Sequence, residues 1–328
     1  IPQANVPRGL SSLVKKRKPD VKQSKSSEQN DDDIQQLLDS NIPLPSDAEV
    51  AFWTLRAQFP RSEYEELRFT APVILRSQLY ALLHEHIALD RDLAKLRQDG
   101  VIREYALLSD GRSSTAFVLI EDLRNLVTER TRTRFEEDLK KRQDQEVGPA
   151  KKARKSQQGK KIAFSAGIQE EISNLENEFH QDMSAIDEYL NQILPRCSAL
   201  YISVSDMERI IAHSRQMPVV TKEIESLVNR LIKLQLLLRR DESSYWFSMP
   251  NMGLVLGWIR DGRRELLRAM KGARFGQVLF EKLSKRRLAR SKLGTVFHIR
   301  DVVGRGDVEV VATGQGPLLR VRPDLDMD

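Results

Sequence analysis

The residues with the clearest chemistry in this sequence are basic side chains gathered near its C-terminal end. Residues 251–300 contain 13 Lys or Arg and only 3 Asp or Glu, a net charge of +10, although the whole chain of 328 residues has a formal net charge of only +6. The rest of the chain is therefore acidic on balance. A segment with such a field attracts phosphate groups, so a nucleic acid, and double-stranded DNA in the leading hypothesis, is the partner that we expect it to bind. The alternative is a basic face that pairs with the acidic N-terminal stretch of this chain or with an acidic partner.

Seven of these basic residues are predicted to contact DNA, in the helices of this segment and in the loops between them. The predicted set is Lys271, Arg274, Arg286, Arg287, Arg263, Arg264 and Arg290. Arginine has a planar fork of donors that suits a phosphate group, whereas lysine has a mobile point charge. The acidic and amide side chains of the segment form no obvious set that would read base edges. We therefore expect phosphate contacts and weak sequence preference.

Residue patterns for catalysis and metal binding are weak in this sequence. His84, Glu85 and His86 are adjacent, but the two histidines lack the i, i+4 spacing of a zinc-binding helix. Gly304-Arg305-Gly306 lacks the strand, the further glycines and the Lys of a phosphate-binding loop. Five histidines and one cysteine, Cys197, give no metal-ligand spacing and no internal disulfide. We therefore expect no enzyme activity, no cofactor and no metal, and a reducing compartment.

The elements that would position the basic residues follow one pattern three times: three amphipathic helices and then a two-stranded hairpin. The sequence therefore predicts a mainly α-helical fold with small β-hairpins, organised as three tandem winged-helix domains. No apolar run reaches the length of a membrane span, so we expect no membrane contact. The predicted parts are a disordered tail (1–45), winged helix 1 (46–125), a charged helix and Lys-rich linker (126–180), winged helix 2 (181–250) and a basic winged helix 3 (251–328).

Local signals predict where several elements begin and end. A helix is predicted to begin at Pro72, and Gly100 is predicted to end a later helix as a C-cap glycine. Ser205 and Glu208 are predicted to form a capping box. A helix over residues 275–283 is predicted as the second helix of the basic domain.

The region between the first two hairpins is predicted to be helical only in part. Residues 122–146 are predicted to form one long charged helix, and residues 147–165 a Lys-rich linker. A new helix is predicted over Met183–Leu194, and Thr221 is predicted to cap another. The third helices of the first two domains carry mixed charge, which favours a role as surfaces for protein partners.

Several runs of this sequence match one known family, in order, between Val50 and Arg322 apart from residues 129–180. The matching runs are Ala71–Tyr80, Asp90–Arg97, Gly100, Ile120–Arg124, Leu194–Cys197, Tyr245–Pro250 and the pair Arg286-Arg287. In these runs the chain resembles the serine/threonine-protein kinase 19 family. Two departures stand beside them, because the Lys-rich insertion near residues 147–165 is longer than expected and Gly257 replaces an expected basic residue.

The resemblance implies a DNA-binding protein of transcription-coupled nucleotide-excision repair, built from three tandem winged helices. It implies a nuclear location on chromatin and three partners: a ubiquitin-ligase subunit, stalled RNA polymerase II and the repair helicase complex. The basic residues of the family's third domain correspond to Lys271, Arg274, Arg286 and Arg287, which the charge count selects independently. The name of the family is misleading, since this sequence lacks the glycine-rich loop and the other phosphate-handling motifs of a kinase.

The sequence leaves alternatives open. The leading hypothesis is a nuclear adaptor that binds DNA through its third winged helix and proteins through the other two. A protein-only scaffold, whose basic face binds an acidic partner, is the main alternative, and an active kinase is a remote one. A homodimer is also left open. A short basic run before Pro19 predicts a nuclear-import signal at Lys15, Lys16, Arg17 and Lys18.

Overall fold

The structure is a computed structural model that describes residues 45–60, 65–68, 70–109, 112–147 and 158–322. The import-signal residues Lys15 to Lys18 and the predicted disordered tail up to residue 44 lie outside the described residues. The chain divides into two compact units. One contains the described residues up to Phe59 together with 74–93 and those from Asp261 onward, and the other contains 60–73 and 94–260.

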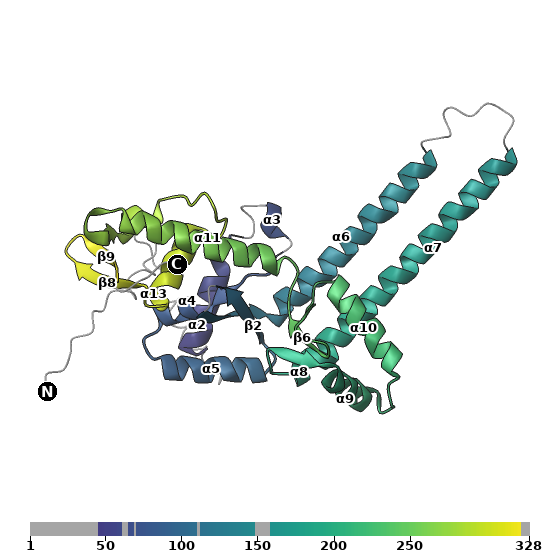
Figure 1. Ribbon diagram of the computed structural model, residues 1–328, viewed down its shortest axis with the longest axis horizontal. Helices are drawn as coiled ribbons and strands as arrows, with labels where there is room; N and C mark the ends of the chain where they lie inside the picture. The colour runs from purple at the N-terminus through teal and green to yellow at the C-terminus, as the bar shows by residue number, and fades with distance from the viewer. Residues whose placement is uncertain (1–44, 61–64, 69, 110–111, 148–157, 323–328) are drawn as a thin grey trace, which may run out of the picture. The chain divides into compact units, whose positions relative to one another are not determined.

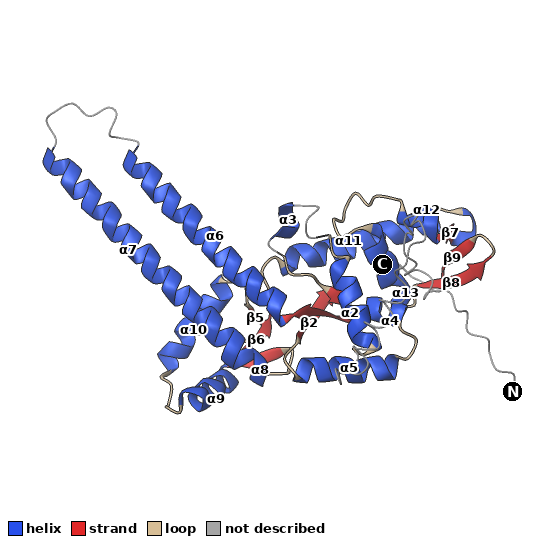
Figure 2. Cartoon of the chain, turned by 180° about the vertical axis from the view of Figure 1, so that it is seen from behind, coloured by secondary structure: helices blue, strands red, loops and turns tan. Residues whose placement is uncertain are grey.

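Helices dominate the structure, and the strands between them are short (Figures 1 and 2). The first set of elements is α2 (Asp47–Ala57), α3 (Glu65–Arg68), β1 (Ile74–Leu75), α4 (Arg76–Leu82), α5 (His86–Gln98), β2 (Ile102–Ser109) and β3 (Arg112–Leu119). The second set is α6 (Ile120–Val147), α7 (Gln158–Glu188), the π-helix η3 (Tyr189–Ile193), α8 (Leu194–Arg196), β4 (Tyr201–Ser203), α9 (Val204–Arg215), α10 (Thr221–Lys233), β5 (Leu237–Arg239) and β6 (Ser244–Phe247). The third set is α11 (Met252–Lys271), the 3-10 helix η4 (Arg274–Gly276), β7 (Gln277–Leu279), α12 (Phe280–Ser284), α13 (Thr295–Gly304), β8 (Val308–Thr313) and β9 (Gly316–Val321).

Each set contains a helix, a short strand, further helices and a closing hairpin, which is the order of elements in a winged helix. The predicted fold class, mainly α-helical with small antiparallel sheets, is confirmed. The two compact units are a different division of the chain from the three predicted domains. The tandem arrangement and its domain boundaries therefore stay a prediction.

The helix predicted over residues 275–283 is wrong in its first half. The backbone of Phe275 has φ 59° and that of Gly276 has φ 62°, and both values turn the chain out of a helix. Residues 277–279 then form β7, which pairs with β9 so that Gln277 lies opposite Arg320. The helix α12 is therefore only five residues long, and the sheet has the order β7–β9–β8.

Three predicted helix starts are also corrected. The stretch after Pro72 is extended, and α4 begins at Arg76, where the side chain of Gln78 accepts a hydrogen bond from Leu75 N at 3.0 Å. The cap of α9 is Ser203, because its Oγ accepts from Asp206 N at 3.1 Å. The predicted capping box at residues 205 and 208 is therefore wrong. Thr221 is the first residue of α10 and not its cap.

The predicted end of α5 at Gly100 is confirmed. Gly100 has φ +70°, and Val101 N donates to Leu96 O at 2.9 Å, which closes the helix in the way that a C-cap glycine allows. The predicted linker at 147–165 is corrected in its second half. Helix α7 already begins at Gln158 and continues to Glu188, so the helix predicted to begin at Met183 is the end of a longer one.

Helices α6 and α7 lie side by side in the second compact unit (Figures 1 and 2). The rings of Phe135 and Phe179 stack between them at 4.5 Å. At the base of α7, Tyr189 is fully buried, as is Ile193 in the same π-helical turn. The charged helix predicted over 122–146 is confirmed as part of α6, and α7 is the element against which it packs.

The first compact unit has its own apolar core, to which α11, α12, α13 and the last hairpin all contribute. The buried residues are Leu266, Leu267, Met270, Leu283, Ile299, Val302, Val308 and Leu319. The end of α13 also meets α4 closely, because a Cβ placed on Gly304 would lie 1.6 Å from the carbonyl oxygen of Ser77. Only a glycine allows the two backbones to approach so closely there.

We predict that Gly304→Ala destabilises the protein by about 1–3 kcal/mol, because the added methyl group overpacks the contact between α13 and α4. Gly257→Ala is the matched control: Gly257 lies inside α11, and a Cβ there meets nothing within 4 Å. This control should stabilise the protein by up to about 1 kcal/mol through helix propensity. Chemical unfolding measures both changes, and equal midpoints for the two variants would contradict the predicted close approach.

Candidate nucleic-acid interface

Five of the seven basic residues predicted to contact DNA are exposed in the structure, and Arg264 is half-buried. The exposed residues are Lys271, Arg274, Arg286, Arg287 and Arg290. The first two lie at the end of α11 and in η4. The other three lie in residues 285–294, between α12 and α13, which we call the basic loop. The first compact unit therefore carries both predicted groups of basic side chains on its surface.

Arg263 is the exception, because its charge is used inside the protein. Its side chain is only 6% exposed, and its Nε and Nη2 each donate to Asp301 Oδ2 at 2.8 Å. The other carboxylate oxygen of Asp301 accepts from Ser77 Oγ at 2.6 Å. Arg263 therefore joins α11 to α13, and the prediction that it contacts DNA is corrected to a structural role.

The basic loop is fixed to α11 through its backbone. The carboxylate of Glu265 accepts from Ala289 N and from Arg290 N, each at 2.9 Å. Burial opposes ionisation of Glu265, but these N–H groups and the charges of Arg286 and Arg290 hold its pKa below the ordinary value. The carboxylate is therefore ionised at neutral pH, and it holds the loop in place on the surface of α11.

The other end of the basic loop is anchored in the core. Ser291 Oγ lies 2.7 Å from His298 Nε2 and accepts from Leu293 N at 3.2 Å. Thr295 Oγ1 donates to the carbonyl oxygen of Arg286. A Cβ on Gly262 would lie 2.3 Å from His298 Nε2, so the histidine ring lies directly against the backbone of α11.

The imidazole of His298 is neutral at physiological pH. The residue is completely buried, and burial lowers its pKa to about 3, with the positive charge of Arg263 as the second cause. A neutral ring can form one hydrogen bond with Ser291 without adding a further charge to the core. His298 is therefore part of the support of the basic loop.

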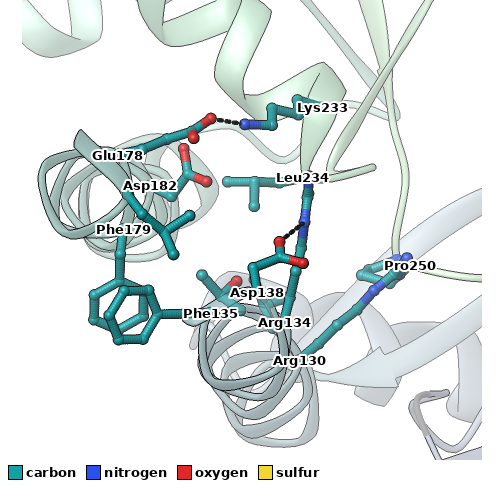
Figure 3. Close-up of a pocket in the computed structure, with 13 residues that line it drawn as sticks. Arg130, Arg134, Phe135, Asp138, Glu178, Phe179, Asp182, Lys233, Leu234 and Pro250 are labelled. Carbon is teal, nitrogen blue, oxygen red and sulfur yellow. Dashed lines mark hydrogen bonds and ion pairs between the residues drawn. The ribbon is translucent and has the colours of Figure 1, made fainter. Parts of the chain in front are cut away.

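A cleft in the second compact unit offers a different kind of site (Figure 3). It is lined by α6, α7 and the end of α10. Four of its six charged side chains form two pairs, Glu178 with Lys233 and Arg134 with Asp138, and Arg130 and Asp182 add one charge of each sign. The ion pair with Lys233 also lowers the pKa of Glu178. The cleft is therefore balanced in charge and does not resemble a phosphate site.

The third helices of the predicted first and second domains use part of their charge within the chain. Asp90 on α5 accepts from the hydroxyl of Tyr80 at 2.8 Å. On α10, Arg230 forms an ion pair with Asp182 of α7 at 2.8 Å. The prediction that these helices bind partner proteins therefore concerns only their remaining surface, and it stays a prediction.

Comparison with known proteins identifies the family of this chain. A family model described as inactive serine-threonine protein kinase 19 matches residues 43–321. The chain belongs to this family. Winged helix repair factor 1 of Homo sapiens is 24% identical over 278 residues, which cover 84% of this chain and 86% of the human protein. The Xenopus laevis protein of the same name is 25% identical over 292 residues, which cover 87% of this chain and 88% of that protein. The Mus musculus protein is 26% identical over 267 residues, which cover 81% of this chain and 82% of that protein.

Membership of the inactive serine-threonine protein kinase 19 family confirms the resemblance drawn from the sequence. The description "inactive" agrees with the prediction that the chain is not an enzyme, and the relatives' name agrees with the winged-helix fold. Among the described residues, no group of three or more His, Cys, Asp or Glu could hold a metal ion. No helix in the same part of the chain is long and apolar enough to cross a membrane.

Sequence reasoning misses the residues that support this family member's basic loop. In the sequence, Glu265 is only one of the three acidic residues in the basic segment, and Gly262 is only a glycine inside a predicted helix. Phe275 falls inside a predicted helix, whereas it is a turn residue with 77% exposure. The run Lys271-Gly-Ala-Arg-Phe-Gly276, with a glycine near each end, is the one local signal for a turn.

We predict that the protein loses stability as the pH falls below 6.5. The pKa of His298 is about 3 in the folded chain, whereas an exposed histidine of the unfolded chain has its usual pKa of 6.5. Between these two values only the unfolded chain binds the proton, which favours unfolding. The loss is about 2 kcal/mol at pH 5. Urea unfolding between pH 7.5 and 5 measures it, in a range where most carboxylates with an ordinary pKa stay ionised.

His298→Gln should flatten this dependence, because Gln does not titrate. His180→Gln is the matched control, since His180 is exposed and its replacement should leave the dependence as in the unchanged chain. Equal pH dependence in all three proteins would show that His298 is not held neutral in the core.

Proposed function

We propose that this chain is a non-enzymatic adaptor that binds double-stranded DNA in transcription-coupled nucleotide-excision repair. The DNA contacts are Lys271, Arg274 and the basic loop. The proposal rests mainly on how the basic loop is held. Glu265 accepts hydrogen bonds from its backbone N–H groups, while the side chains of Arg286, Arg287 and Arg290 remain exposed. This arrangement directs a concentrated positive charge toward solvent.

The chemistry of these side chains suits phosphate groups. Arginine forks form paired hydrogen bonds with phosphate oxygens, and such contacts position a protein on a duplex without reading its sequence. Arg264 is half-buried and is kept in the proposed set, whereas Arg263 is left out because it is bound to Asp301. We therefore expect binding that depends strongly on salt and weakly on base sequence.

The relatives support the repair role. Proteins named winged helix repair factor 1 match this chain over most of its length in three vertebrates. By the resemblance described above, we propose that the chain works in the nucleus, on chromatin, with a ubiquitin-ligase subunit, stalled RNA polymerase II and the repair helicase complex. We propose that winged-helix surfaces outside the basic segment bind these proteins.

We predict that the double variant Arg286→Glu/Arg287→Glu loses at least about 100-fold in affinity for a duplex of arbitrary sequence. The slope of log affinity plotted against log salt concentration should also become shallower, by about 0.9 for each phosphate group that the variant no longer binds. Fluorescence anisotropy of a labelled duplex, across a salt series, measures both quantities. The fold should be unchanged, because both side chains are exposed.

The matched control is Arg132→Glu/Lys140→Glu, which changes the net charge equally at two exposed positions of α6. It should bind the duplex nearly as tightly as the unchanged chain. If both double variants lose affinity equally, the site assignment is wrong and only the net charge matters. If the unchanged chain binds no duplex, the basic face belongs to an acidic protein partner instead.

A further inference from the structure

Phe275 occupies an unusual position in the predicted DNA-binding segment. Its side chain is 77% exposed, and its backbone has φ 59°, a region that side chains with a Cβ rarely adopt. A ring so exposed gains little free energy from burial, and a Gly or Asn would adopt this positive φ at a lower cost. The position therefore points to a role outside the folding of the chain.

The turn that carries Phe275 is held on both sides. Gly276 N donates to Ala273 O at 3.0 Å, which closes the turn. Directly after it, Gln277 enters β7 and lies opposite Arg320 of β9. The ring is thus presented from a braced turn at the edge of a sheet, and not from the end of a loose loop.

The surroundings of the ring are positively charged. The guanidinium of Arg274 lies 5.0 Å from the ring centre, in a cation–π contact. Lys271 and Arg320 are exposed on the neighbouring elements. Cations around an exposed ring suit a ligand that has an anionic backbone and flat apolar faces, which is the chemistry of a nucleic acid with an accessible base. An apolar protein pocket would instead have to bury these charges.

We infer that Phe275 stacks on an unpaired base at a junction between single-stranded and double-stranded DNA, while Lys271 and Arg274 hold the adjoining phosphates. This inference rests on the proposed function and names the form of DNA that the site prefers. The ring has no hydrogen-bonding group, and every base has a π-face, so the contact is indifferent to base identity. In an intact duplex the bases are covered by their neighbours, so the ring contributes little there.

The test compares a fully paired duplex with a forked duplex that carries 2-aminopurine at the junction. The unchanged chain should bind the fork more tightly and change the 2-aminopurine fluorescence. Phe275→Ala should weaken fork binding about tenfold, within the range for stacking of one base on an aromatic ring. Its affinity for the duplex should stay within about twofold, and its salt slope should not change.

Two further variants guard against an effect on the fold. Phe275→Asn removes the ring but keeps a residue that tolerates positive φ, so its effect should match that of the alanine variant. Phe275→Trp keeps a stacking ring and should retain the preference for the fork. Ile87→Ala is the matched control, because Ile87 is an 81% exposed apolar residue on α5, and its replacement should change neither binding nor fluorescence.

The outcomes separate this inference from the proposed function. If the Phe275 variants bind the fork as tightly as the unchanged chain, while Arg286→Glu/Arg287→Glu loses both DNAs, the stacking role is overturned and the DNA-binding function stands. Absence of any preference for the fork in the unchanged chain overturns the stacking role as well. If the charge reversal leaves both affinities intact, the proposed DNA contacts fail, whatever the Phe275 variants do.

Discussion

The buried carboxylate of Asp301 is the interaction on which the first compact unit depends. It lies on α13 and accepts from Ser77 of α4 and from Arg263 of α11, so one side chain joins three helices. A buried carboxylate is tolerated only when it is paired and fully hydrogen-bonded, which restricts how these helices can be arranged. Beside it, the amide of Gln78 donates to Phe297 O at 3.1 Å and ties α4 to α13 a second time. The position of α11 relative to α13 then determines where the basic loop can run.

The sequence predicts most of the helices, because their apolar residues recur at helical spacing over ten or more positions. It misses the third strand of each sheet, namely β1, β4 and β7, which are two or three residues long. The partners of β4 and β7 are distant in the sequence: Tyr201 lies opposite Trp246, and Gln277 opposite Arg320. A pattern of three residues has no periodicity to detect, and its pairing is decided by the tertiary fold.

The charge count locates the candidate site but does not distinguish its members. Arg263 and Arg264 are neighbours in the sequence, yet successive residues of a helix point about 100° apart, so one reaches Asp301 and the other stays nearer the surface. Glu265 reduces the net charge of the segment, but in the structure its carboxylate is what holds the basic loop. Composition therefore finds the region, and only contacts between distant residues assign a role to each side chain.

The anchoring of the basic loop has a kinetic consequence. Because Glu265, Ser291 and His298 already hold the loop in one conformation, little conformational entropy is lost when an anionic ligand arrives. Association is then limited by the encounter itself, which the positive field accelerates, and no slow ordering step follows. A surface of this kind can release and rebind a polyanion many times without rearrangement. It therefore suits many short encounters along an extended polyanion rather than one long-lived complex.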